Sequence, residues 1–446
     1  MNEPLYKMQR KLSLRRAAAV RKGIVGIIDI GTSKVICFIL KFTPDESKNH
    51  LSSDEVYLPE NVAFRVVGVA TTRSRGVSFG EINSMDEVEK AIRTVVQAAQ
   101  KMAGVLIEDV LVSFSGGFPK SYGVFGQTNV VGGEVTEEDI SNALMNCDIP
   151  AYGSDREVIH ALPVNFSLDG RSGLIDPRGQ IGNELMVDVH LMTVDQTLIK
   201  NVVQSIKKCQ LDLSGISFSP YLSGVSSLTE DEIQLGAGCI DLGAGSSGLT
   251  IFLQKQMIYA GSVRLGGMQI TSDIMKAFQI SYNQAERIKT LHGGLISTGR
   301  DDRDLIELPR KLAKWEHDRP AITRSELIGV IRPRVEEIFE ELLLQLSAAG
   351  FENMDSQKIV LTGGASQMPG LLELAGKILD CQVRLGRPIR VQGLPHATNG
   401  PDFAAAIGLS LNAGHPQDEC WDFKAPFNRA GITKFNGAFR WFFENW

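Results

Sequence analysis

Apolar runs separated by short polar turns dominate the chain. Residues 23–40 and 238–267 each contain apolar runs broken by an Asp-Gly turn, which predicts hairpins of buried strands. Residues 88–104 and 332–350 have apolar positions at helical spacing and end in Gly, which predicts amphipathic helices. Residues 357–379 read as a strand, a Gly-Gly turn and a helix. This mixture predicts an α/β (α+β mixed) fold rather than an all-helical one.

The end of the chain, 431–446, has a different pattern. On a helical projection one face is polar and basic and the other is apolar, which is typical of a helix that lies in a membrane interface. The apolar face consists of Ile432, Phe435, Phe439, Phe442, Phe443 and Trp446. The alternative is a terminal helix that packs on its own core. The preceding residues, 411–430, lose periodicity and gain Pro, Gly, Asn and Asp, so we expect a flexible linker there and favour the membrane interpretation.

Composition narrows the class of protein. With 446 residues and 43% hydrophobic content, the chain is long enough for about two to four domains. A net charge of −6 gives no support for nucleic-acid binding. Six scattered cysteines without a CxxC pair suit a reduced, cytosolic protein without a zinc site. The N-terminal residues 1–22 are basic but lack the apolar core of a secretory signal. We expect a disordered basic tail, either merely solvated or attracted to anionic lipid.

Three Gly-rich turns are the candidate chemistry: 29–34 (DIGTSK), 241–248 (DLGAGSSG) and 361–370 (LTGGASQMPG). Each alone also suits a plain turn. Together they suit phosphate, because Gly lets backbone N–H groups approach its oxygens closely. Asp29 and Asp241 end apolar strands and could hold Mg²⁺, mostly through its waters. No P-loop and no convincing GxGxxG motif is present.

Two Asp-Gly hairpins followed by a Gly-Gly turn resemble the phosphate 1, phosphate 2 and adenosine motifs of the actin-like ATPases. The resemblance implies two similar α/β domains that close on ATP and Mg²⁺. Further segments resemble the FtsA family of bacterial cell-division proteins, over about residues 22–410. These segments are 110–126, 134–140, 158–193, 261–274 and 285–293.

The FtsA resemblance implies a division of the chain. It implies a first actin-like domain core (23–84, 164–194 and 371–410) and an inserted FtsA-type subdomain (85–163). It also implies a second domain core (195–270 and 332–370) with a small subdomain (271–331). The linker (411–430) and a C-terminal amphipathic membrane-targeting helix (431–446) then follow.

The same resemblance assigns the nucleotide-binding residues. They are Asp29, Gly31, Thr32, Ser33, Lys34, Asp241, Gly243, Ala244, Gly245, Ser246, Ser247, Glu286, Lys289, Gly363, Gly364, Ala365, Ser366 and Met368. For Glu286 and Lys289 the alternative is an exposed ion pair three residues apart. Ser219 and Pro220 stand where hydrolytic relatives carry the Gln or Glu that positions water, so we expect slow or absent ATP hydrolysis and assign no catalytic residue.

The resemblance also implies a function. Such a protein polymerises and tethers filaments of FtsZ to the cytoplasmic face of the cell inner membrane at the division septum, and helps recruit downstream division proteins. The FtsZ tail is expected to dock on 271–331, where Lys276, Arg303 and Arg324 are candidates, although each could be a solvated basic residue. The alternatives are a pilus-assembly-type scaffold, a rod-shape filament protein or an actin-fold sugar kinase.

Overall fold

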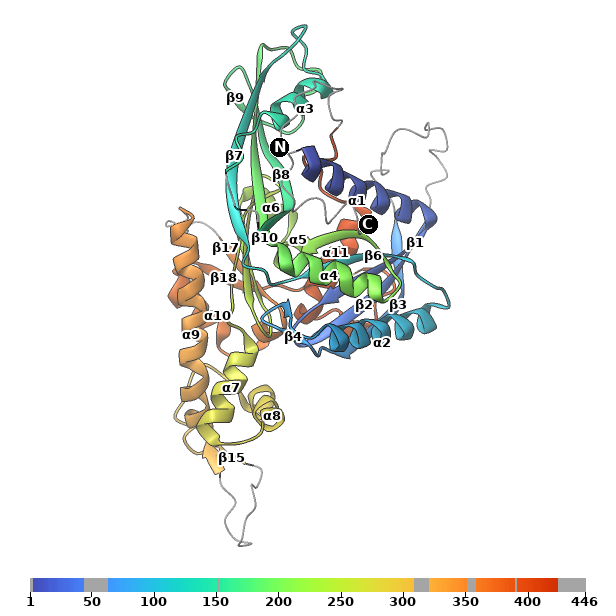
Figure 1. Ribbon diagram of the computed structural model, residues 1–446. Helices are drawn as coiled ribbons and strands as arrows, with labels where there is room; N and C mark the ends of the chain where they lie inside the picture. The colour runs from blue at the N-terminus through green and yellow to red at the C-terminus, as the bar shows by residue number, and fades with distance from the viewer. Residues whose placement is uncertain are drawn as a thin grey trace.

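The computed structural model describes the backbone of residues 3–8 and residues 9–43, 63–150, 153, 155–308, 321–350, 358–389 and 391–423. Figure 1 shows an elongated molecule with a sheet of long strands at one end and a group of helices at the other. Within the part of the chain that is described, no helix is both long enough and apolar enough to cross a membrane.

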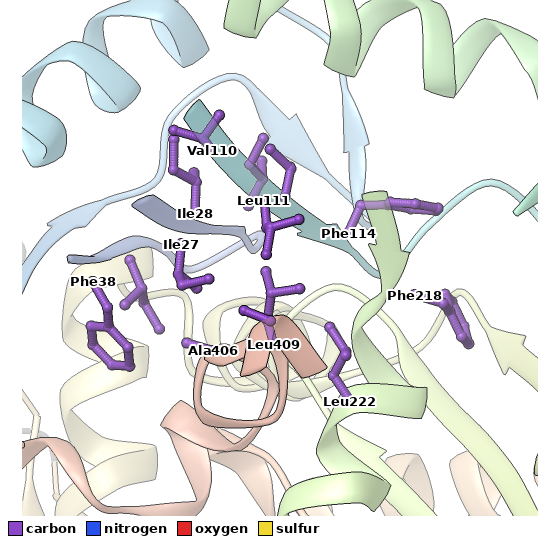
Figure 2. Packing of buried hydrophobic residues seen from close by; sticks show 14 of the residues in the cluster. Ile27, Ile28, Phe38, Val110, Leu111, Phe114, Phe218, Leu222, Ala406 and Leu409 are labelled. Carbon is purple, nitrogen blue, oxygen red and sulfur yellow. The ribbon is translucent and has the colours of Figure 1, made fainter. Parts of the chain in front are cut away.

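The first half of the body is built on a five-stranded sheet in the order β11-β6-β1-β2-β3. Its hairpin β1–β2 is antiparallel, while β1 and β6 run parallel. Helices cover both faces, which is why these strands read as nearly continuous apolar runs. In Figure 2, Ile27 and Leu409 point toward each other between β1 and α11, whereas Ile28 and Val110 point to the opposite face. The bounds are β1 (Ile24–Ile30), β2 (Lys34–Phe42), β3 (Phe64–Arg73), β6 (Asp109–Phe114), β11 (Asp212–Phe218), α2 (Met85–Ala103), α4 (Gln196–Lys208), α5 (Ser219–Ser227) and α11 (Ala404–Gly414).

The second half repeats this design in the sheet β14-β13-β12-β17-β18. Here β12 pairs antiparallel with β13 and parallel with β17, as β1 does with β2 and β6. The helices α7 and α8 form the far end of the molecule beside α9 (Figure 1). The bounds are β12 (Ala237–Leu242), β13 (Ser247–Leu253), β14 (Gln256–Val263), β17 (Lys358–Thr362), β18 (Gln382–Leu385), α6 (Glu230–Leu235), α7 (Gly267–Phe278), α8 (Tyr282–His292), β15 (Leu305–Glu307), β16 (Ala321–Thr323), α9 (Arg324–Ala348) and α10 (Leu371–Leu379).

A third sheet, in the order β7-β10-β8-β9, projects from the first half and carries α3 on one face (Figure 1). The expected bounds of the inserted subdomain, 85–163, differ from this arrangement. The apolar stripe of α2 packs in the core of the five-stranded sheet, which β6 joins, whereas β10 pairs with β7 along its length. The insert therefore begins after β6 and continues to β10. Its bounds are β7 (Lys120–Asn129), α3 (Glu137–Met145), β8 (Arg156–Leu168), β9 (Arg171–Leu174) and β10 (Glu184–Asp195).

The N-terminal segment is a docked helix, α1 (Glu3–Lys22), so the expectation of a disordered tail is wrong. Its buried side chains, Leu12, Ala17, Ala19 and Val20, recur at helical spacing and face the body. The many basic residues between them hid this apolar stripe in the sequence, because composition alone favoured a solvated tail.

The expectation of a flexible linker at 411–430 is also wrong for residues 411–423, which are the part of it that the structure describes. Residues 411–414 belong to α11, and the following strap, residues 415–423, packs against the insert. Cys420 and Trp421 are buried, and the Cys420 N–H donates to the carbonyl of Ala161 at 2.8 Å. Residues 424–430 and the expected helix at 431–446 lie outside the described residues.

Candidate functional site

A cleft of about 1030 Å³ lies between the two halves of the body. The expected nucleotide-binding residues line this cleft, with two exceptions, Ser247 and Ser366. The Ser247 hydroxyl donates to the carbonyl of Leu265 at 2.8 Å, and the Ser366 hydroxyl donates to the carbonyl of Gly363 at 2.7 Å. Both serines are buried and hold the shape of the turns instead of facing the cleft.

The first two Gly-rich turns face each other across the cleft. A Cβ atom placed on Gly245 would lie only 2.5 Å from the Thr32 hydroxyl oxygen, so only glycine allows this approach. The same hydroxyl accepts a hydrogen bond from the Gly80 N–H at 2.9 Å, and Ser246 contacts Ser115 at 3.3 Å between their hydroxyl oxygens. One hairpin from each half therefore contributes to a single site.

The third turn joins this site from the strand next to β12. Thr362 pairs with Asp241 in the parallel register of β12 and β17, and the carboxyl ends of parallel strands share one edge of the sheet. Gly363 has a φ of 87°, and a Cβ atom there would lie 2.3 Å from Asp241 Oδ1. Any other residue at this position would be strained and would collide with the carboxylate.

Two buried carboxylates lie at the base of the cleft. Asp29 Oδ1 accepts hydrogen bonds from the hydroxyls of Ser113 at 2.7 Å and Ser219 at 3.2 Å, and Asp241 Oδ2 accepts one from Ser223 at 2.6 Å. Burial raises the pKa of Asp29, and burial with the nearby charge of Asp29 raises the pKa of Asp241 to about 6. Two acids in such a setting suit a divalent cation.

These carboxylates do not form a complete metal site by themselves. Among the residues that the structure describes, no group of three or more His, Cys, Asp or Glu side chains could hold a metal ion. Magnesium usually takes one or two carboxylates and completes its shell with water and substrate phosphates. Asp29 and Asp241 fit that arrangement, with the phosphate ligands supplied by a nucleotide.

The charge of Lys34 is held at the wall of the cleft. Its ammonium group makes an ion pair with Asp402 and lies 3.5 Å from the centre of the Phe403 ring. Asp402 and its neighbour Pro401 line the cleft but were not expected from the sequence. The Gly-Pro-Asp-Phe turn before the apolar α11 is the only local signal that could have drawn attention to them.

The helix α8 forms another wall. Glu286 and Lys289 make the ion pair that was the alternative interpretation, at 2.8 Å, but the pair lines the cleft. Lys289 also donates to the carbonyl of Gly267 at 2.9 Å and to the Thr271 hydroxyl at 2.7 Å. The pair therefore connects α8 to the start of α7.

Sequence reasoning missed several other lining residues. Tyr282 and Asn283 precede Glu286 by about one turn of α8, so the helical periodicity could have indicated them. The loop after β3 carries no recognisable sequence motif, so its position at the cleft could not be predicted from the sequence. Its lining residues are Arg73, Ser74, Arg75, Gly76 and Val77.

Beside the cleft, Arg264 connects the two halves. Its guanidinium group lies 4.7 Å from the ring centre of Phe79 and 4.9 Å from that of Phe118. It also makes an ion pair at 3.5 Å with Glu81, which belongs to the small hairpin of β4 (Val77–Ser78) and β5 (Glu81–Ile82). A residue of the second half is therefore held by the first half and by the root of the insert.

Ser219 and Pro220 line the cleft beside Asp29, at the start of α5. The Ser219 hydroxyl donates to Asp29 at 3.2 Å. A short side chain engaged in this way is poorly suited to orient an attacking water, and the expectation of slow or absent hydrolysis stays a prediction.

The candidates for FtsZ docking lie away from this cleft. Lys276 on α7 and Arg303 before β15 are exposed. Arg324 is engaged within the fold, because it makes an ion pair with Asp301 at 3.0 Å and donates to the carbonyl of His292 at 3.2 Å.

The fold and the cleft define the class of protein: a two-domain actin-like protein. One similar solved structure is the PilM–PilN type IV pilus biogenesis complex, with a TM-score of 0.58 and 15% sequence identity over 87% of this chain and 98% of that chain. Another is MreB5 of Spiroplasma citri bound to ADP, with a TM-score of 0.50 and 12% identity over 87% of this chain and 95% of that chain.

Sequence comparison identifies the family. A family model described as the SHS2 domain inserted in FTSA matches residues 116–193, and one described as cell division protein FtsA matches residues 238–408. The cell division protein FtsA of Agrobacterium fabrum is 34% identical over 89% of this chain and 88% of its own length. That of Escherichia coli is 30% identical over 88% of this chain and 90% of its own length. The chain belongs to the FtsA family of cell division proteins.

Family membership favours the cell-division interpretation over the alternatives, and the likeness to the PilM–PilN complex and MreB5, at 12–15% identity, shows the fold alone. The matched range 116–193 also agrees with the sheet β7-β10-β8-β9 as the inserted subdomain.

Proposed function

We propose that this protein binds ATP with Mg²⁺ in the cleft and tethers FtsZ filaments to the cytoplasmic face of the cell inner membrane at the division septum. The observation that carries the nucleotide part is the convergence of three Gly-rich turns, from three separate parts of the chain, on one cleft. A nucleotide in the similar fold of MreB5 supports the same use here.

In this proposal the two hairpin turns surround the phosphates with backbone N–H groups, and Asp29 and Asp241 hold Mg²⁺, mostly through its waters. The Gly363–Gly364 turn and α8 face the nucleoside. Lys34 contributes positive charge once it exchanges Asp402 for a phosphate oxygen. Because Ser219 replaces a water-positioning side chain, ATP acts as an assembly ligand with slow turnover at most.

The adaptor function depends on residues 431–446 as a membrane-targeting helix. A short amphipathic helix binds a bilayer weakly, because ordering it offsets much of the gain from burying its apolar face. Self-association into actin-like filaments joins many such helices, and later insertions then occur at high effective concentration. ATP binding that favours assembly therefore also favours membrane attachment.

The FtsZ C-terminal peptide docks, in this proposal, on the small subdomain that contains α7, α8 and the β15–β16 hairpin. The exposed Lys276 and Arg303 supply positive charge for an acidic peptide, whereas Arg324 is already paired with Asp301. Downstream division proteins would join the assembly through other surfaces.

Co-flotation of FtsZ with anionic liposomes in the presence of ATP tests the proposal. We expect FtsZ to float with the full chain and to stay behind with a chain that ends at Ala430. A matched pair of full-length variants separates the chemistry of the helix from its length: Phe439→Glu should abolish flotation, and Asn436→Glu on the polar face should retain it.

Two results would contradict parts of the proposal. If the full chain floats without FtsZ, the adaptor function is wrong while the anchor stands. If the full chain does not float at all, 431–446 is a packing helix and the membrane function fails.

A further inference from the structure

Among residues 9–22 of α1, whose side chains the structure describes, the exposed ones are basic or apolar. Lys11, Leu14, Ala18 and Arg21 are exposed, on the side of the helix opposite to the buried Leu12. The sequence contains no Asp or Glu from Pro4 to Ile28. From residue 9 to residue 22 the helix therefore presents positive charge to solvent without an acidic residue of its own.

The acidic groups near α1 lie on its inner side and at its end. Asp422 of the strap accepts a hydrogen bond from Ser13, and Asp109 makes an ion pair with Lys22 at 2.8 Å. Gln9 donates to the carbonyl of Val158 at 2.9 Å. These contacts fix the helix against the insert and the strap, so the direction of its outer face is fixed as well.

The chain continues toward its C-terminus from a point beside α1. The strap contacts α1 through Asp422 and ends at 423, and its Glu419 bonds His160 of the insert at 2.9 Å. The eight residue steps from 423 to 431 can span at most about 29 Å when fully extended. The amphipathic segment that begins at residue 431 therefore starts within that distance of the strap.

We propose that the outer face of α1 is a second membrane contact, which binds the headgroups of anionic lipids and orients the body on the bilayer. The inference rests on the proposed anchoring function of 431–446. The terminal helix supplies insertion, and α1 supplies electrostatic attraction with a fixed orientation. A helix docked on a rigid body can orient the filament, whereas an anchor on a short tether cannot.

The test is co-sedimentation of the full chain with vesicles of phosphatidylcholine alone or mixed with phosphatidylglycerol. The double variant carries Lys11→Glu together with Arg21→Glu. We expect each reversed charge to lower its affinity for the anionic vesicles by about fivefold or more. The difference should disappear at high salt, because the attraction is screened. Binding to phosphatidylcholine vesicles should not change.

The matched control reverses exposed lysines on other helices, Lys101→Glu on α2 and Lys377→Glu on α10. It changes the net charge by the same amount and should bind the anionic vesicles as the unmodified chain does. A photo-crosslinking residue in place of Ala18 gives a direct readout, and we expect it to label lipid in the full chain.

The outcomes separate the two proposals. If both double variants bind anionic vesicles as the unmodified chain does, or if both weaken equally, the α1 contact is wrong and the terminal anchor still stands. If truncation at Ala430 leaves binding unchanged, the terminal anchor fails. The α1 contact then stands as a contact in its own right only if Lys11→Glu with Arg21→Glu abolishes that binding.

Discussion

At the scale of single residues, Asp241 is a carboxylate whose burial in the cleft costs stability when it is charged. Its carboxylate is buried at the end of β12, with the hydroxyl of Ser223 as a partner and Asp29 nearby. Burial raises its pKa from 3.8 to about 6. The folded protein therefore binds the proton of this carboxyl more tightly than the unfolded chain does. This difference contributes stability below about pH 4, and the contribution is lost as the pH rises through about 6.

We predict that Asp241→Asn stabilises the protein without nucleotide by about 1–3 kcal/mol near neutral pH and above. The amide keeps a partner for Ser223 and removes a buried charge. The gain should vanish below about pH 4, where the unmodified carboxyl is protonated too. Thermal unfolding across this pH range measures it.

The exposed Asp302→Asn is the control and should show no such pH dependence. The same Asp241→Asn variant should bind Mg-ATP more weakly, as isothermal titration can show. Equal stability of Asp241→Asn and the unmodified chain at all pH values would contradict the account of a charge destabilised by burial.

At the scale of elements, α1 and the strap pack against the body, whereas the sequence predicted a disordered tail and a flexible linker in their place. The two meet where Ser13 contacts Asp422, and each covers part of the junction between the insert and the first half. In Figure 1, α1 lies along the body below the insert. Local signals at both segments favoured flexibility, and contacts far apart in sequence decided otherwise.

We predict that Leu12→Ala loosens α1, whereas Leu14→Ala does not. Leu12 is 5% exposed and Leu14 is 39% exposed, so the same deletion removes buried contacts only in the first case. Truncating a buried leucine costs about 2–5 kcal/mol. Backbone amides of residues 9–22 should therefore exchange hydrogen about thirtyfold faster or more in Leu12→Ala.

Hydrogen exchange measured by mass spectrometry on peptides from α1 and, as an internal reference, from α2 checks this prediction. Fast exchange of α1 in the unmodified chain would show that the helix is not docked, and would also remove the basis for its fixed orientation.

At the scale of the whole molecule, the two halves meet at the cleft and at Arg264. The guanidinium group of Arg264, in the second half, lies over the rings of Phe79 in the first half and Phe118 at the root of the insert. Because Gly267, the first residue of α7, lines the cleft three residues after Arg264, this contact connects the arrangement of the halves with the site.

We predict that Arg264→Ala weakens ATP binding by about fivefold to thirtyfold, since each cation–ring contact contributes about 0.5–1 kcal/mol to the closed arrangement. Arg264→Lys keeps the charge near Glu81 but loses planar stacking, and should fall in between. Titration with ATP measures affinity, and small-angle scattering reports whether the halves separate. Unchanged affinity and shape in Arg264→Ala would mean that this contact does not hold the halves together.

The sequence by itself determined the elements whose signals are local. The two Asp-Gly hairpins and the Gly-Gly turn are readable because each depends on a few adjacent residues, and they are the motifs that resemble the actin-like ATPases. Nearly all the residues assigned to the cleft do line it. Ser247 and Ser366 do not, because the direction of a side chain in a turn depends on what surrounds it.

Only the tertiary structure decided which distant segments meet. The ion pair of Lys34 with Asp402, the position of Arg264 and the bounds of the insert all depend on pairings between remote parts of the chain. The same holds for α1, whose basic residues suggested a solvated tail until the body offered its buried stripe a surface to cover. Local pattern specifies an element, but its stability and its neighbours follow from apolar area that only the folded body can bury.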